Sequence, residues 1–184
     1  AVSNPVMDVM KASVVIVIGA NPTVNHPVAA TWIKNAVKQG TQLILCDPRK
    51  SDLARLSHRH LQFKPDTDVA LLNSMMHVIV HENLIDQSFI ESRTIGFEEL
   101  KRNVEGYSPE LMAPICGIDS EDIRYAARLY AKSPASMILW GMGVSQHIHG
   151  TDNARCLIAL ALMTGEIERP STGIHPIRIQ NNIK

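Results

Sequence analysis

One run of residues, Val14-Val15-Ile16-Val17-Ile18 closed by Gly19, constrains the fold of this chain more than any other feature. A strand that is apolar at every position, and not only at alternate ones, is typical of a parallel sheet with both faces covered. After Pro27 the apolar residues recur with helical spacing, over Ala29, Trp32, Ile33, Ala36 and Val37. The sequence therefore predicts a buried strand followed by an amphipathic helix, which is the start of a βαβ unit.

The same alternation continues along the chain. Further strands are predicted at residues 43–46, 61–63 and 136–140. Long helices are predicted after Asp66 or Thr67, after Asp119 or Ser120, and after Thr151, with short helices over 84–116 and irregular structure from Glu166 onward. We therefore expect an α/β fold with a Rossmann-like, mostly parallel sheet flanked by helices.

The length of 184 residues suits one globular domain, and 45% apolar residues can supply its core. We expect an α/β domain over residues 1–172 and an irregular tail over 173–184 that leads into a further domain. The chain has no initiator Met, and its last five residues, 180–184, do not read as a natural terminus. We therefore expect it to be a piece of a longer protein.

Charge, hydropathy and cysteine usage exclude several function classes. Lys and Arg total 18 against 18 Asp and Glu, so nothing favours nucleic acid or an acidic membrane surface as a partner. The longest apolar run, 14–20, is far shorter than the roughly 20 residues that span a bilayer. No signal peptide is recognisable, and we expect a cytoplasmic protein. The three widely spaced cysteines, Cys46, Cys116 and Cys156, are expected to be small buried residues.

Unusual polar residues follow the predicted strands. In an open parallel sheet, ligands bind beyond the carboxyl ends of the strands. Gly19-Ala20-Asn21 follows the first strand, and the helix that begins near Pro27 would favour a phosphate there, although every capped helix has such a terminus. Asp47 follows the second strand and suits either a ribose hydroxyl or an ordinary Asp-Pro turn. Arg49 and its neighbour Lys50 would contact phosphate or solvent.

Two further loops carry candidate groups. Asp66-Thr67-Asp68 can cap a helix, and a carboxylate can also read the two N–H donors of guanine. Gly141-Met142-Gly143 begins like a dinucleotide fingerprint, but Gln146 stands where the last glycine belongs, so a nicotinamide cofactor is weakly supported. Two His-x-His pairs, at 58 and 60 and at 147 and 149, lack the third ligand that a zinc site needs.

Taken in order, these segments resemble the catalytic subunit of molybdopterin-dependent formate dehydrogenases. The likeness extends over nearly the full length. Its most specific part is the tail Arg178-Ile179-Gln180-Asn181-Asn182, which favours this family over nitrate reductases. The matching segments are residues 17–23 with His26-Pro27, then 46–49, 64–68, 141–146, 162–165 and 175–182.

The resemblance implies a bis-molybdopterin guanine dinucleotide cofactor with molybdenum or tungsten. It assigns Gly19, Ala20, Asn21 and the loop to Asn25 to a pyrophosphate or pterin edge. It assigns Asp47, Pro48 and Arg49 to the guanosine ribose and base, and Asp66 and Asp68 to guanine. It places Met142 and Gln146 in the pterin cleft, Arg178 beside the metal where it would orient formate, and Gln180 close by.

For the parent enzyme the resemblance implies oxidation of formate to carbon dioxide. The metal-binding Cys or selenocysteine and the cysteines of the 4Fe-4S cluster precede this segment in the family. The implied partners are the remaining domains of the same subunit and electron-transfer subunits, and this segment alone is expected to be inactive. Ile179, Glu168 and Ser171 replace residues that are usually glycine, which bears on the geometry of Arg178 because glycine reaches positive φ most easily.

Three other interpretations stay open. A structural homologue could keep the sheet and lose the cofactor, although an unused cleft has no need of Asp47, Asp66, Gln146 and Arg178 together. The central domain of a thiamine-diphosphate enzyme has a similar layout, but the 178–182 tail is not expected there. A simple nucleotide-binding module, or a molybdopterin oxidoreductase with another substrate, also fits the loops.

Overall fold

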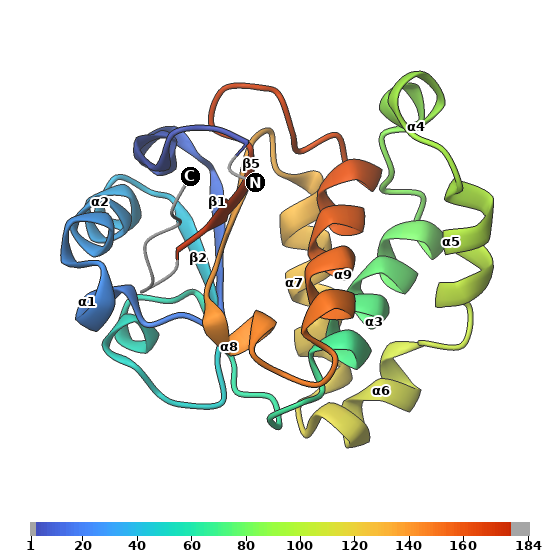
Figure 1. Ribbon diagram of the computed structural model, residues 1–184, viewed down its shortest axis with the longest axis horizontal. Helices are drawn as coiled ribbons and strands as arrows, with labels where there is room; N and C mark the ends of the chain where they lie inside the picture. Colours follow the sequence, from blue (N-terminus) through green and yellow to red (C-terminus); the bar gives the residue numbers. More distant parts are fainter. Residues whose placement is uncertain (1–2, 178–184) are drawn as a thin grey trace.

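The computed structural model describes residues 3–177, and its centre is a five-stranded sheet. The strands are β1 (Val14–Ile18), β2 (Gln42–Cys46), β3 (Arg59–Leu61), β4 (Ser136–Trp140) and β5 (Gly173–Pro176). They lie in the order β3-β2-β1-β4-β5, and each neighbouring pair is parallel. Helices lie on both sides of this sheet (Figure 1). The predicted α/β fold with a mostly parallel sheet flanked by helices is confirmed.

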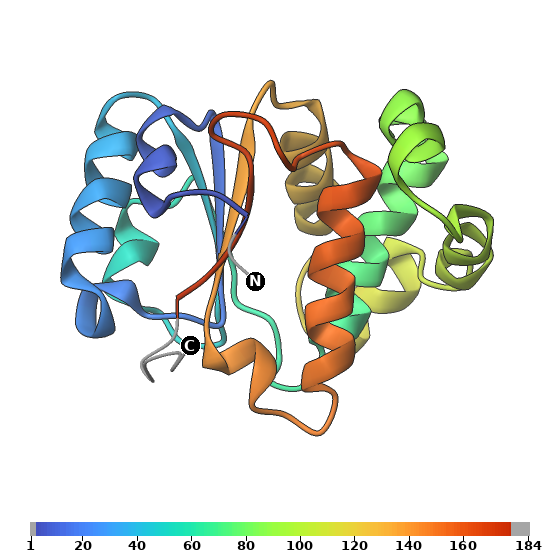
Figure 2. The ribbon, with the colours of Figure 1, turned by 45° about the horizontal axis from the view of Figure 1, so that its top comes forward.

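The helices form layers on the two faces of the sheet. In Figures 1 and 2, α2 lies on one side of the strands and α7 and α9 lie on the other, with α4, α5 and α6 farther out. The helical segments are η1 (Val6–Lys11), α1 (Pro22–Asn25), α2 (Pro27–Lys38), η2 (Asp52–Arg55), α3 (Asp68–His81), α4 (Gln87–Arg93), α5 (Phe97–Val104), α6 (Pro109–Cys116), α7 (Ser120–Lys132), α8 (Met142–Ser145) and α9 (Gly150–Met163). No helix among residues 3–177 has the length and apolar character needed to cross a membrane.

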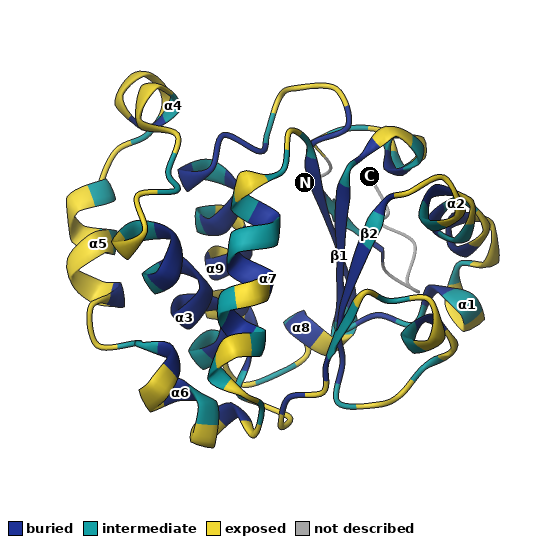
Figure 3. Cartoon of the chain, turned by 180° about the vertical axis from the view of Figure 1, so that it is seen from behind, coloured by how far each residue is buried: buried dark blue, intermediate teal, exposed yellow. Residues whose placement is uncertain are grey.

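Both faces of the central strands are buried, as the unbroken apolar runs predicted. Val15 and Val17 of β1 pack in the cluster that includes Ile33 of α2. Ile16 and Ile18 pack in the larger cluster with α3, α7 and α9. Every residue of β1 and β4 is buried, and the central strands are dark blue in Figure 3. Burying one such aliphatic side chain stabilises the fold by about 1.5–3 kcal/mol, so these strands anchor the loops at their ends.

Several helices and strands begin or end at residues other than those predicted. The third strand covers Arg59–Leu61 and not residues 61–63; Phe63 is still buried but lies past the ladder. A one-turn helix, α1, forms where a loop was predicted, because Pro22 suits the first helical position. The last helix begins at Gly150 with His149 at its N-cap, so Thr151 does not cap it. The three cysteines are free and buried, as predicted.

The prediction of irregular structure from Glu166 onward is wrong for Gly173–Pro176, which form β5. This strand is short and contains proline, so its own sequence does not predict it. β4 pairs with one side of it, and on the other side the Ser3 hydroxyl forms hydrogen bonds with the backbone of Ile174. The loop before β5 holds Glu168 at φ 59° and Ser171 at φ 65°. The backbone therefore keeps a glycine-like conformation at two positions where the sequence has no glycine, at a cost in strain.

Candidate functional site

The loops that follow all five strands line one cavity of about 280 Å³. It lies at the carboxyl edge of the sheet, where the chain turns from the β1–β2–β3 half to the β4–β5 half. This reversal of strand order leaves a crevice between the loops after β1 and β4, which is the usual ligand position in such sheets.

The structure brings together nearly all the residues that the family resemblance assigned to a cofactor. Gln146 is exposed and does not line the cavity, whereas its neighbour His147 does. Arg178 and Gln180 lie outside the described residues. The predicted residues that line the cavity are Gly19, Ala20, Asn21, Asn25, Asp47, Pro48, Arg49, Asp66, Asp68 and Met142.

Glycines allow the loops after β1 and β4 to touch. The N–H of Gly143 donates to the carbonyl of Gly19 at 2.9 Å, and the N–H of Gly141 donates to that of Ile18 at 3.1 Å. A Cβ at either Gly141 or Gly143 would lie 2.6 Å from the Gly19 oxygen, closer than real Cβ contacts come. Gly19 itself has φ 56°. The glycines resembling a dinucleotide fingerprint therefore serve loop-to-loop packing at the crevice.

Asp47 forms the turn after β2. It is 3% exposed, and its Oδ1 accepts the N–H of Arg49 at 2.7 Å. Its backbone carbonyl accepts Nε2 of His60 at 2.9 Å, which ties this turn to β3. Asp47 is also among the residues that border the cavity. Of the two interpretations of Asp47, the turn is present, and the same residue lines the cavity.

Two more carboxyl groups come from the segment that leads into α3. Asp68 is the first residue of the helix and is 3% exposed, whereas the Asp66 side chain is half exposed on a residue at φ 66°. Burial raises the pKa of the Asp68 carboxyl to about 6, because desolvation outweighs the backbone hydrogen bond and the attraction of His147. The segment that leads into α3 therefore brings one buried and one half-exposed aspartate to the cavity lining.

His147 is a site residue that the sequence reasoning missed. Its Nε2 lies in hydrogen-bonding contact with the carbonyl of Gly143, and because a carbonyl only accepts, Nε2 is the donor. Its Nδ1 lies 3.7 Å from Oδ1 of Asp66, so the ring links the loops after β4 and β3. The signal was its place in a polar loop after a strand, which the His-x-His spacing obscured.

Zinc binding gains no support from the other pair. Nδ1 of His58 accepts the N–H of Leu43 at 3.1 Å, and His60 holds the Asp47 carbonyl. Within residues 3–177, no group of three His, Cys, Asp or Glu side chains is placed to hold a metal ion.

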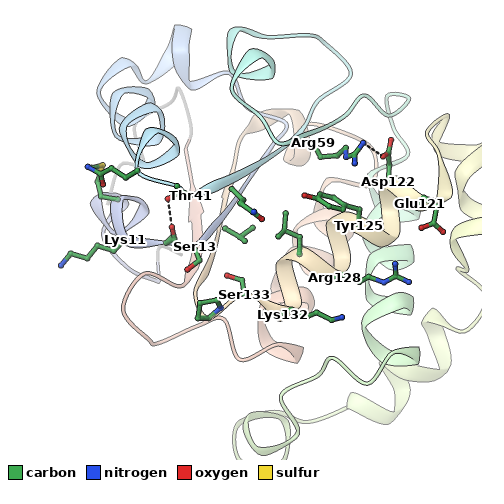
Figure 4. Close-up of a pocket in the computed structure, with 18 of the residues that line it drawn as sticks. Lys11, Ser13, Thr41, Arg59, Glu121, Asp122, Tyr125, Arg128, Lys132 and Ser133 are labelled. Atoms are coloured by element: carbon green, nitrogen blue, oxygen red, sulfur yellow. Dashed lines mark hydrogen bonds and ion pairs between the residues drawn. The ribbon is translucent and has the colours of Figure 1, made fainter.

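A larger cavity of about 1300 Å³ opens at the opposite edge, between α7 and the starts of β1 and β2 (Figure 4). Arg59 lines it, with Nη1 3.1 Å from Oδ1 of Asp122 and its guanidinium 4.8 Å from the Tyr125 ring centre. None of the residues predicted to bind cofactor lines it. It also lies at the amino ends of parallel strands, where such sheets rarely bind ligands, so the smaller cavity is the candidate site.

Comparisons with known proteins identify the family and its relatives. The family model described as "Molybdopterin oxidoreductase" matches residues 1–183. Formate dehydrogenase H of Escherichia coli is 44% identical over 184 residues, covering 100% of this chain and 26% of that protein. The alpha subunit of an F420-dependent formate dehydrogenase of Methanocaldococcus jannaschii is 41% identical, covering 100% of this chain and 27% of that protein. The chain thus spans about a quarter of the length of these relatives.

The similarity extends to proteins with other named activities. The assimilatory nitrate reductase catalytic subunit of Bacillus subtilis is 33% identical over 180 residues, covering 98% of this chain and 25% of that protein. Among solved structures, acetylene hydratase from Pelobacter acetylenicus superposes with a TM-score of 0.83 at 28% identity, covering 90% of this chain and 25% of that one. Shared fold therefore does not select one substrate.

Proposed function

The chain belongs to the molybdopterin oxidoreductase family, and we propose that its carboxyl-edge cavity binds the guanosine end of one molybdopterin guanine dinucleotide. The observation that carries this proposal is the convergence of five loops, with Asp47, Asp66 and Asp68, on one cavity. A volume of about 280 Å³ is close to the lower end of ligand pockets, roughly 300–1,000 Å³, and suits one end of a dinucleotide better than the whole.

The carboxyl groups fit guanine. An ionised carboxylate has two acceptor oxygens, and guanine presents two adjacent donors, N1–H and the exocyclic amine. Asp66 and Asp68 stand two residues apart at the start of α3, and both line the cavity. Asp47, after the neighbouring strand, is proposed to accept hydrogen bonds from ribose hydroxyls, which its position in the cavity lining supports.

Other residues of the cavity lining fit a phosphate. Asn25 and His26 line the cavity directly before α2, a helix of 12 residues whose N-terminus favours negative charge. Gly19 and Gly143, which have no side chain to block a ligand, also line the cavity. A guanine near the carboxyl groups and a pyrophosphate near the helix N-terminus are therefore compatible with the lining residues.

For the parent enzyme we infer oxidation of formate to carbon dioxide, supported by the 44% and 41% identity to formate dehydrogenases. When bound, the molybdenum or tungsten of the cofactor supplies the two-electron chemistry. Residues of this chain would hold and orient the cofactor. Arg178, which follows the cavity residue Ile177, is proposed to orient formate through its guanidinium. A nitrate-reducing parent is the second candidate, favoured by the identity of 33% to a nitrate reductase.

Binding of GDP to this chain, measured by titration calorimetry with ADP as the comparison nucleotide, tests the cofactor proposal. We expect GDP to bind more tightly than ADP. Because hydrogen bonds to charged groups contribute roughly 1.5–3 kcal/mol each, Asp66→Ala with Asp68→Ala should weaken GDP binding at least tenfold. Asp52→Ala is the control, since that carboxylate is exposed and lies outside the cavity. Equal affinity for GDP and ADP, or no effect of the double substitution, would contradict guanine reading by this loop.

The substrate proposal needs the parent enzyme. We expect it to reduce an artificial acceptor with formate and to show no reduction of nitrate, and Arg178→Ala should abolish the formate reaction. Turnover of nitrate with none of formate would establish the second candidate instead.

A further inference from the structure

A buried carboxylate lies at the edge of the sheet opposite the candidate site. Glu166, in the loop between α9 and β5, is 2% exposed. Its Oε2 accepts the backbone N–H of Ser136, the first residue of β4, at 2.8 Å. Its Oε1 lies 3.1 Å from Nη2 of Arg169. A buried charge needs such partners, because removing it from water without them is unfavourable.

Arg169 extends this contact into a bracket around the start of β4. Its Nε donates to the carbonyl of Gly165 at 3.0 Å, and its Nη1 donates to that of Pro134 at 3.2 Å. One guanidinium thus joins the loop that leads to β5 with the segment that leads to β4. Arg169 also closes a tight turn with Thr172, whose Oγ1 donates to the Arg169 carbonyl at 2.9 Å.

The bracket sits where the register of β5 is decided. β5 begins one residue after this turn, and Gly173 stands opposite Met137 of β4. At the other end of the strand, the N–H of Ile177 donates to the carbonyl of Trp140 at 2.8 Å, and Ile177 lines the candidate cavity. A slip of one residue in the pairing of β5 with β4 would turn every β5 side chain to the other face of the sheet. It would also shift Ile177 relative to the cavity.

We propose that Glu166 is a positioning residue, which fixes the register of β5 against β4 and so places Ile177 at the cavity. β5 has little of its own to hold it, because it is short, ends in proline and lies at the edge of the sheet. The competing interpretation is a buried ion pair that stabilises the domain as a whole. The functional part of the inference rests on the proposed cofactor site, whereas the register itself does not.

Hydrogen–deuterium exchange of the 184-residue chain separates the two. With Glu166→Ala, amides of β5 and Ile177 should exchange at least tenfold faster, while those of β1 and β2 change less than twofold. Glu166→Gln should have a smaller effect, because its amide oxygen can still accept from Ser136. Glu168→Gln is the matched control, since it removes an exposed carboxylate of the same loop, paired with Arg93, and should leave β5 within twofold.

Equal acceleration throughout the sheet, no acceleration in β5, or the same effect from Glu168→Gln would overturn the proposal. If Glu166→Ala does not fold, Glu166→Gln and Arg169→Gln replace it in the exchange experiment, and Arg169→Gln should also accelerate exchange selectively in β5.

GDP titration of the same variants measures the effect at the cavity. Glu166→Gln should weaken GDP binding, and Glu168→Gln should not. Unchanged GDP affinity despite fast β5 exchange would overturn the link to the site. Failure of the unaltered chain to bind GDP would count against the cofactor proposal and leave exchange to decide the role of Glu166.

Discussion

Replacement of Asp68 by Asn should stabilise the free protein at neutral pH and not at acid pH. Asp68 is 3% exposed and its pKa is raised from 3.8 to about 6, chiefly by burial. A raised pKa means that the folded state binds the proton more tightly than the unfolded chain does. The contribution of protonated Asp68 to the free energy of unfolding is therefore fully present below pH 3.8. It is lost as the pH rises from there through about 6.

The size of the effect follows from the shift. A difference of about two pKa units, at 1.36 kcal/mol per unit, corresponds to roughly 3 kcal/mol. The amide that replaces the carboxyl group in Asp68→Asn carries no charge at any pH, so the variant lacks this loss. We expect the difference in free energy of unfolding, variant minus unaltered chain, to grow by up to about 3 kcal/mol between pH 4 and pH 7 and to stay constant above that.

Urea denaturation of both proteins at each pH from 4 to 8 measures this difference. Only its change with pH matters, so a constant offset from the altered helix start cancels. Asp52→Asn removes an exposed carboxylate that bears no burial cost and should not reproduce the gain. A difference that is flat over the whole range, or one that shrinks as pH rises, would refute the argument that burial dominates at Asp68.

Three further outcomes are expected. Gly143→Ala should destabilise the chain by a few kcal/mol and weaken GDP binding, because its Cβ would lie 2.6 Å from the Gly19 oxygen, whereas Gly106→Ala, in open space, should change the urea midpoint little. Asp119→Ala should cost about 0.5–2 kcal/mol in thermal or urea unfolding, since Asp119 caps α7 by accepting the N–H of Glu121 at 2.8 Å; no loss would argue against that cap. The isolated chain should show no formate oxidation with an artificial acceptor, and measurable turnover would contradict the proposal that it only holds cofactor within a larger enzyme.

Sequence reasoning succeeded where a segment carries its own signal. β1 and β4 were predicted to the residue, because continuous apolar runs bounded by Gly19 and Gly141 fit only a strand covered on both faces. The convergence of Asp47, Asp66 and Asp68 followed from topology alone, since parallel strands end at a common edge. The fold class and the position of the cleft could therefore be predicted from the sequence.

It failed where a segment depends on distant partners. β5 has the composition of a turn, and pairing with β4 on one side and Ser3 on the other makes it a strand. Gln146 was expected in the cleft, but the single-turn helix α8 places it outside and brings His147 in. The bracket around Glu166 joins residues 30 apart and has no local pattern.

The most direct test of the central claim is a map of backbone amide chemical shifts while GDP is added to the ¹⁵N-labelled chain. We predict that the shifted amides gather at Gly19, Arg49, Asp66 and Gly143, around the carboxyl-edge cavity. Shifts confined to the amino-edge groove, around Ser13 and its neighbours on α7, or no shifts at millimolar GDP, would contradict the account.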